Sequence, residues 1–124
     1  GSIGNGVNRQ GVVDHEVPVL KVATADGKLR GVMFGYACHN TTLTDTFYQF
    51  NGDYAGYVQA EIEQAHPGAV AMFMMGAGAD INPEPRGKLE MAQAHGKALA
   101  ETVARILAGS LRPLRGNLNT SLPR

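Results

Sequence analysis

Two apolar runs dominate the hydrophobic pattern, at residues 31–37 and 69–75, and each gives way to small and polar residues. The first run leads to His39 and the second to Asp80. Short runs of this kind, rich in Val, Phe and Met and bounded by glycine, are typical of buried strands. Residues 16–24 predict a further strand, and Asp26-Gly27 predicts a tight hairpin turn to a strand over residues 29–37.

Two other segments carry apolar residues at helical spacing. Tyr54, Val58 and Ile62 share one face of a helix that Asn51 or Asp53 can cap and that runs to residue 65, and residues 88–108 form a longer helix. Gly96 lies inside that helix, where we expect it to permit close packing against the sheet. The order strand, strand, helix, strand, helix predicts an α/β fold with a small mixed sheet, a hairpin followed by a right-handed βαβ crossover. Residues 3–110 form one domain in this reading, and residues 111–124 form a polar tail.

The crossover makes the second and third strands parallel, so their carboxyl ends meet at one edge of the sheet. Open α/β sheets place their ligands at this edge, and His39 and Asp80 are therefore expected to face one crevice. The third strand is apolar on both faces, and two helices cannot cover a three-stranded sheet completely. We therefore expect the chain to complete its fold as a homo-oligomer.

Composition narrows the class of protein. The 124 residues suit one domain, and 44% hydrophobic with 18% charged residues is ordinary for a folded protein. A formal net charge of zero without a Lys/Arg cluster argues against a nucleic-acid partner. No apolar run is long enough to span a bilayer and no signal-peptide pattern is present, so the expected location is cytoplasmic. The single cysteine, Cys38, excludes an intramolecular disulfide.

Three motifs carry a resemblance to a known family. Residues 36–43 (YACHNTTL), 51–57 (NGDYAGY) and 78–83 (GADINP) occur in an order that resembles the neutral/alkaline (non-lysosomal) ceramidase family, especially its bacterial ceramidase-like members. The resemblance implies an internal slice of that family's longer catalytic domain. It also implies an amide-cleaving zinc site with two histidines, a glutamate and a tyrosine as ligands. His39 matches the second histidine, and Arg9 matches an arginine that helps to hold the polarised oxygen.

Asn82 stands where the family has a serine, and an amide side chain cannot act as a nucleophile. The leading hypothesis is therefore a hydrolase dependent on zinc, or on another divalent transition metal, whose activated water attacks a small ester, phosphoester or amide. His39, Asp80 and Asp53 are the candidate ligands, completed across an oligomer interface, and Arg9 balances developing negative charge.

Several alternatives stay open. Asp80 acts as a ligand, as a general base, or only as a loop-fixing residue, and Asp53 binds metal or caps the helix. Thr41, Thr42 and Asn82 are the candidate substrate contacts. The rival hypothesis is a non-catalytic, truncated fragment that folds by oligomerising.

Overall fold

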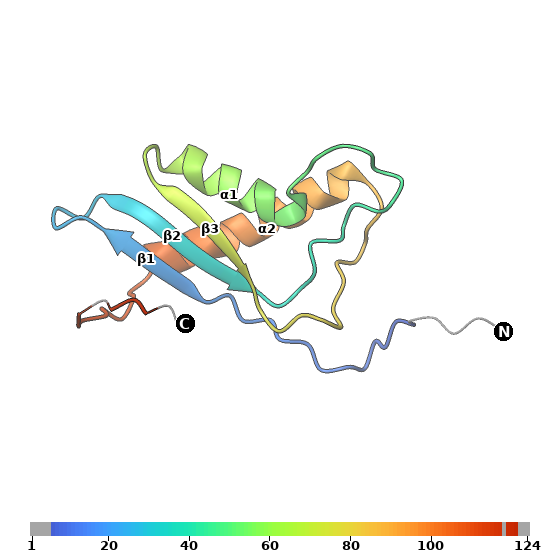
Figure 1. The fold of residues 1–124 in the computed structure, drawn as a ribbon, viewed down its shortest axis with the longest axis horizontal. Helices are drawn as coiled ribbons and strands as arrows, with labels where there is room; N and C mark the ends of the chain where they lie inside the picture. The colour runs from blue at the N-terminus through green and yellow to red at the C-terminus, as the bar shows by residue number, and fades with distance from the viewer. Residues whose placement is uncertain (1–5, 118, 122–124) are drawn as a thin grey trace.

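The computed structural model of the protein describes residues 6–117 and 119–121. Its elements are β1 (Val19–Ala23), β2 (Leu29–Tyr36), α1 (Asp53–Ala65), β3 (Val70–Met75) and α2 (Leu89–Ala108) (Figure 1). The sheet has the order β1-β2-β3, with β1 antiparallel and β3 parallel to β2. The predicted α/β fold with a small mixed sheet is confirmed.

The hairpin forms at Asp26-Gly27, but β1 is shorter than residues 16–24. Pro18 has no N–H to donate to a ladder, although its carbonyl oxygen accepts the Gly35 N–H at 3.0 Å. At the other end, Thr24 belongs to the turn, where its hydroxyl bonds to Asp26 and its N–H donates to the Lys28 carbonyl. Gly27 has φ +86°, a conformation that suits glycine. The turn residues therefore set where the two strands end.

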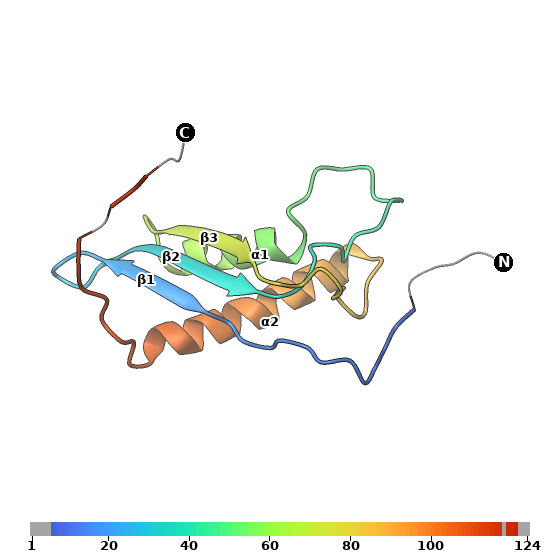
Figure 2. The same cartoon turned by 60° about the horizontal axis from the view of Figure 1, so that its bottom comes forward.

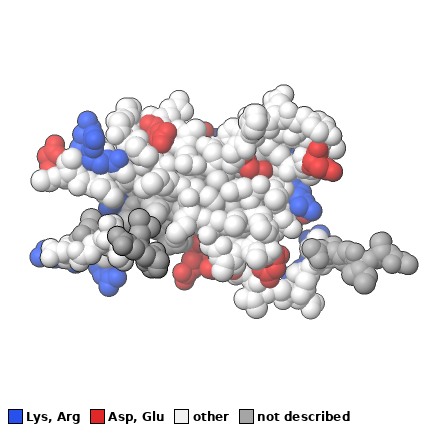
Figure 3. Space-filling view, in the orientation of Figure 1, with Lys and Arg blue, Asp and Glu red and all other residues white. Residues whose placement is uncertain are grey.

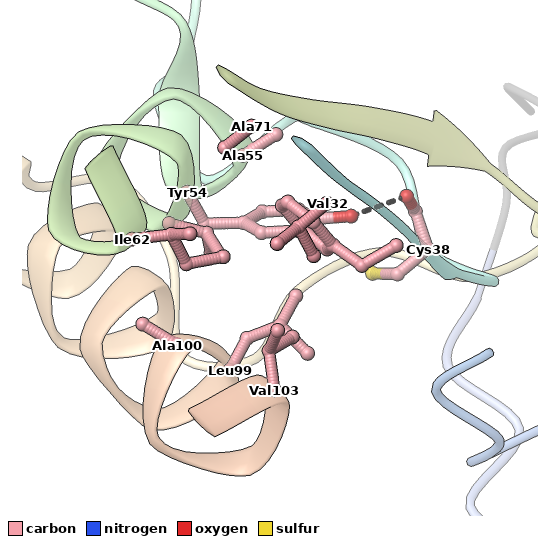
Figure 4. Close-up of a cluster of buried hydrophobic side chains, with 11 residues drawn as sticks. Val32, Cys38, Tyr54, Ala55, Ile62, Ala71, Leu99, Ala100 and Val103 are labelled. Atoms are coloured by element: carbon pink, nitrogen blue, oxygen red, sulfur yellow. Dashed lines mark hydrogen bonds between the residues drawn. The ribbon is translucent and has the colours of Figure 1, made fainter. Parts of the chain in front are cut away.

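Both helices cover the same face of the sheet (Figures 1 and 2). Between them and the strands lies one core, in which Phe73 packs its ring against Phe34 at 5.6 Å and against Tyr54 at 5.7 Å. Figure 4 shows this cluster, to which β2, β3, α1 and α2 all contribute: Val32, Phe34, Ala71, Tyr54, Ala55, Val58, Ile62, Leu99, Ala100 and Val103, with Cys38 beside β2. Burial of these apolar side chains is the main force that holds the layers together.

Gly96 packs against α1, whereas the sequence predicted that it would pack against the sheet. A Cβ atom at Gly96 would lie 2.5 Å from the Cβ of Tyr57 and 2.9 Å from the carbonyl oxygen of Tyr54. The missing side chain therefore allows the two helices to approach closely, which brings α2 over the core.

The other face of the sheet is not covered by a helix (Figure 2). Strand register aligns its outward residues in three rows across β1, β2 and β3. We call these nine residues the open face. Its three rows are Val22-Gly31-Val70, Leu20-Met33-Met72 and Pro18-Gly35-Met74. Pro18 is placed in the third row because its side chain approaches Gly35. All nine are apolar or glycine. Within the described ranges, no helix is long and apolar enough to cross a membrane.

Candidate functional site

The segments that follow β2 and β3 run side by side. The His39 N–H donates to the Ile81 carbonyl at 3.0 Å, and the Gly87 N–H donates to the Thr42 carbonyl at 2.7 Å. We call residues 37–43 and 76–87 the strand-end loops. Their contact agrees with the prediction that the carboxyl ends of the two parallel strands share one edge of the sheet.

Gly78 allows this contact. A Cβ atom at this position would lie 2.4 Å from both the Ala37 carbonyl carbon and the Cys38 nitrogen. These neighbours are backbone atoms, which cannot rotate away as a side chain could. The glycine therefore fixes how closely the two strand-end loops approach.

Two histidines contact the two ends of residues 79–85. The His39 Nε2 atom lies 3.0 Å from the Ala79 carbonyl oxygen, and the His95 Nε2 atom, on α2, lies 2.7 Å from the Pro85 carbonyl oxygen. A carbonyl oxygen only accepts hydrogen bonds, so each Nε2 carries the proton and each Nδ1 remains available. The sequence gives no signal for the His95 contact, because nothing in a helical pattern indicates which loop a helix will meet.

The predicted substrate contacts divide into two groups. The Thr41 hydroxyl donates to Asn82 Oδ1 at 2.8 Å, which leaves the N–H groups of the exposed Asn82 amide available to a ligand. Asp80 is exposed in the same loop. Thr42 is fully buried and its hydroxyl has no hydrogen-bond partner, so a substrate contact at Thr42 would require the loop to open.

Asp53 is the first residue of α1 and does not form the cap that the sequence left as one alternative, because the N-cap residue is Gly52 and the helix has no side-chain capping bond. Its buried carboxylate accepts the Leu43 N–H at 2.8 Å and the Tyr54 N–H at 2.7 Å. The Asp53 backbone has φ +52°, which is uncommon for a residue with a side chain, and its N–H donates to Asn51 Oδ1 at 2.7 Å. These bonds tie the loop after β2 to the start of α1.

The candidate ligands do not by themselves complete a zinc site within the described residues. Zinc requires about three protein ligands around one point. Within residues 6–117 and 119–121, no three His, Cys, Asp or Glu side chains are grouped to hold a metal ion. Both Asp53 oxygens bind backbone N–H groups, and His39 uses Nε2 for the Ala79 carbonyl. Arg9 lies exposed in the segment before β1, and its side chain has no hydrogen-bond partner in the described part of the chain.

A pocket of about 490 Å³ opens beside the strand-end loops. Its wall is mainly apolar, with polar groups at several points, and comes from the segment before β1, the end of β2, α1, the loop after β3 and α2. The lining residues are Val13, His15, Val17, Tyr36, Cys38, Tyr54, Ile81, Asn82, Pro83, Glu84, His95, Ala98, Leu99 and Thr102. Asn82 belongs both to this wall and to the bond with Thr41, so the pocket and the polar loop residues adjoin.

Two groups in the pocket wall are kept protonated by burial. Burial raises the pKa of the Tyr54 phenol and the pKa of the Cys38 thiol above their ordinary values. The Tyr54 hydroxyl donates to the Cys38 carbonyl at 2.6 Å (Figure 4). The part of the wall around Tyr54 and Cys38 is therefore uncharged, which suits the apolar part of a ligand, whereas Glu84 brings a carboxyl group to another part of the wall. Sequence reasoning missed the pocket because its lining comes from five separated segments.

Comparisons with known proteins support the fold. No protein-family model matches the chain, and no curated protein matches it. Among solved structures, it is similar to the neutral ceramidase from Pseudomonas aeruginosa, with TM-score 0.67 and 20% identity over 75% of this chain and 17% of that chain. It is also similar to a ceramidase complexed with C2, with TM-score 0.69 and 20% identity over 75% of this chain and 16% of that chain.

The chain therefore spans about a sixth of the length of these structures, 17% and 16%. At 20% identity, the likeness concerns the fold and not the site. The motif resemblance is confirmed to this extent: the chain has a ceramidase-like fold.

Proposed function

We propose that this chain is a ceramidase-like hydrolase that binds an amphipathic ester or amide across the pocket and the strand-end loops. The observation that carries the proposal is the position of Asn82, which joins an apolar pocket of ligand size to exposed polar groups. The structural similarity to neutral ceramidases supports the same class of reaction.

Each residue of the proposed site has a role that follows from the chemistry of its side chain. The apolar part of the substrate lies against Leu99 and the neutral wall around Tyr54. The free N–H groups of Asn82 donate to the substrate carbonyl and bind it more strongly as negative charge develops on its oxygen. Asp80 accepts a proton from the attacking water and returns it to the leaving group, a role typically worth about 10²–10⁴-fold in rate.

A zinc site that includes His39 is a separate proposal, and none of the roles given to Asp80, Asn82 and Leu99 requires zinc. His39 offers Nδ1 as one ligand, and the remaining ligands would come from outside the described residues or from a second copy. Elemental analysis of purified protein and of His39→Ala tests this. Zinc near one equivalent that is lost in His39→Ala would support the metal site, whereas zinc-free protein with undiminished hydrolysis would contradict it.

Binding without turnover is the second candidate function. The lack of three converging metal ligands among the described residues favours it. Measured binding of an amphipathic ester without hydrolysis would establish this alternative.

The decisive experiment compares 4-nitrophenyl acetate with 4-nitrophenyl octanoate. If the acyl chain enters the pocket, kcat/KM rises with chain length, since each buried methylene contributes about 0.8 kcal/mol. Ala98→Trp places a ring in the pocket from α2 and should raise KM for the octanoate at least tenfold. Ala104→Trp, exposed on the same helix outside the pocket, is the matched control.

Two further variants test the polar residues. Asp80→Asn and Asn82→Ala should lower kcat with little change in KM, because both groups act on the reacting atoms. Glu61→Gln on the exposed side of α1 should change neither constant. Equal octanoate and acetate rates together with an inert Ala98→Trp would refute the proposed binding mode.

A further inference from the structure

His95 has no role in the proposed function, although its side chain reaches from α2 to the loop that carries Asp80 and Asn82. Its Nε2 atom lies 2.7 Å from the Pro85 carbonyl oxygen and donates to it. We propose that His95 is a positioning residue, which holds Pro85 so that the Asn82 amide meets the reacting carbonyl of the substrate. This inference rests on the proposed hydrolase function, because it concerns how that site keeps its shape.

The backbone around Pro85 has little else to hold it. Among the described residues, the bond from His95 is the one hydrogen bond that the backbone of residues 82–86 makes. The nearest backbone bonds on either side are donated by the N–H groups of Ile81 and Gly87. Without the imidazole, this stretch would be fastened through its backbone only beyond its two ends.

The sequence of the stretch carries the position of Pro85 to Asn82. The rings of Pro83 and Pro85 fix φ at about −65°, and a residue that precedes a proline, as Asn82 does, is restricted to extended backbone. Few rotations are therefore free to absorb a displacement of Pro85. The Thr41 hydroxyl holds only the side-chain oxygen of Asn82, at 2.8 Å. The backbone that carries the amide consequently depends on the bond from His95.

His95 stands at a firm point of α2. The next residue, Gly96, lies where α2 meets α1, and a Cβ atom there would be 2.5 Å from the Cβ of Tyr57 and 2.9 Å from the Tyr54 carbonyl oxygen. The helices cannot come closer at this point, and the core beneath holds them together. An anchor on a packed helix places its partner more precisely than an anchor on a loop would.

His95 also lines the pocket, so two roles must be separated. If His95 positions Asn82, its loss lowers kcat for 4-nitrophenyl acetate and for the octanoate by the same factor, because both esters react at the same carbonyl. If His95 only shapes the pocket wall, its loss raises KM for the octanoate and leaves the acetate unchanged. Both esters are uncharged. The acidic side chains that Figure 3 shows near the loop after β3, which Figure 1 locates in the same view, therefore attract neither ester over the other.

The test compares His95→Leu, which removes the donor, with His95→Gln, which keeps an N–H at about the reach of Nε2. A misplacement of about 1 Å can cost about 10²-fold in rate, so His95→Leu should lower kcat for both esters at least tenfold. His95→Gln should recover kcat to within about threefold of the wild type. Gln93→Leu, exposed on the same helix and outside the pocket, is the matched control and should change neither constant. His95→Asn is too short to reach Pro85 and should lose as much as His95→Leu, so the result does not rest on the folding of one variant.

Amide chemical shifts measured by NMR report the placement without any turnover. The Asp80 and Asn82 signals should move in His95→Leu and return towards the wild type in His95→Gln. A wild-type chain that hydrolyses neither ester would refute the proposed function, and the NMR signals would still decide the placement. Unmoved signals would overturn the positioning role. With an active wild type, an unchanged kcat in His95→Leu, or a change confined to KM for the octanoate, would also overturn it.

Discussion

Replacing Gly78 by alanine tests how closely the strand-end loops are fitted to each other. The new Cβ atom would lie 2.4 Å from two backbone atoms of Ala37 and Cys38, whereas an ordinary contact begins at 3.4 Å. The loops must therefore separate by about 1 Å, and the bond from the His39 N–H to Ile81 lies in the path of that movement. Overpacking costs about 1–3 kcal/mol, and we expect the upper part of this range because no side chain can rotate to relieve the clash.

Urea unfolding at neutral pH, followed by far-UV circular dichroism, measures the loss as a lower midpoint with an unchanged slope. Gly56→Ala is the matched control, because its Cβ meets nothing within 4 Å inside α1. That change should stabilise the protein by about 0.5–1 kcal/mol through helix propensity. The same chemical substitution thus has opposite expected signs at two positions. A Gly78→Ala protein as stable as the wild type would refute the close fit of the loops.

Three other changes have expected results. Thr42→Val removes a buried hydroxyl without a partner and should raise the free energy of unfolding by about 1 kcal/mol, measured by urea unfolding. Tyr54→Phe leaves the Cys38 carbonyl without its donor and should lower the same quantity by about 1–2 kcal/mol. Burial raises the pKa of Cys38 and the pKa of Tyr54 above 9.0 and 10.0, so the unfolded chain releases these protons first. The free energy of unfolding should therefore be highest near neutral pH and should fall above about pH 9. The fall should be less steep in Tyr54→Phe. A free energy of unfolding that stays constant to pH 11 would contradict this prediction.

The hydrophobic pattern was sufficient to predict the fold because each element has a local signal. Two apolar runs joined by an amphipathic helix identified the parallel pair, and Asp26-Gly27 identified the hairpin. The limits of β1 were wrong at both ends, because the turn bonds of Thr24 and the missing N–H of Pro18 are not visible in an apolar pattern.

The site was predicted less completely, because its contacts join distant segments. Strand order placed His39 and Asp80 at one edge of the sheet, and the Thr41–Asn82 bond agrees with that placement. The partner of His95 and the lining of the pocket depend on how α2 and the segment before β1 pack. Those positions follow from tertiary contacts, such as the contact of Gly96 with α1. Contacts of this kind join residues at irregular distances along the chain, so the hydrophobic periodicity of the sequence does not predict them.

The hydrogen bond from His39 to the Ala79 carbonyl has a consequence for any metal ion that reaches the imidazole. Nε2 carries the proton in the tautomer that makes this bond, and Nδ1 carries the lone pair. A metal ion bound at Nδ1 would leave the bond to Ala79 intact. A metal ion bound at Nε2 would replace that proton and break the bond. The choice of ring nitrogen would therefore decide whether metal binding releases the segment that carries Asp80.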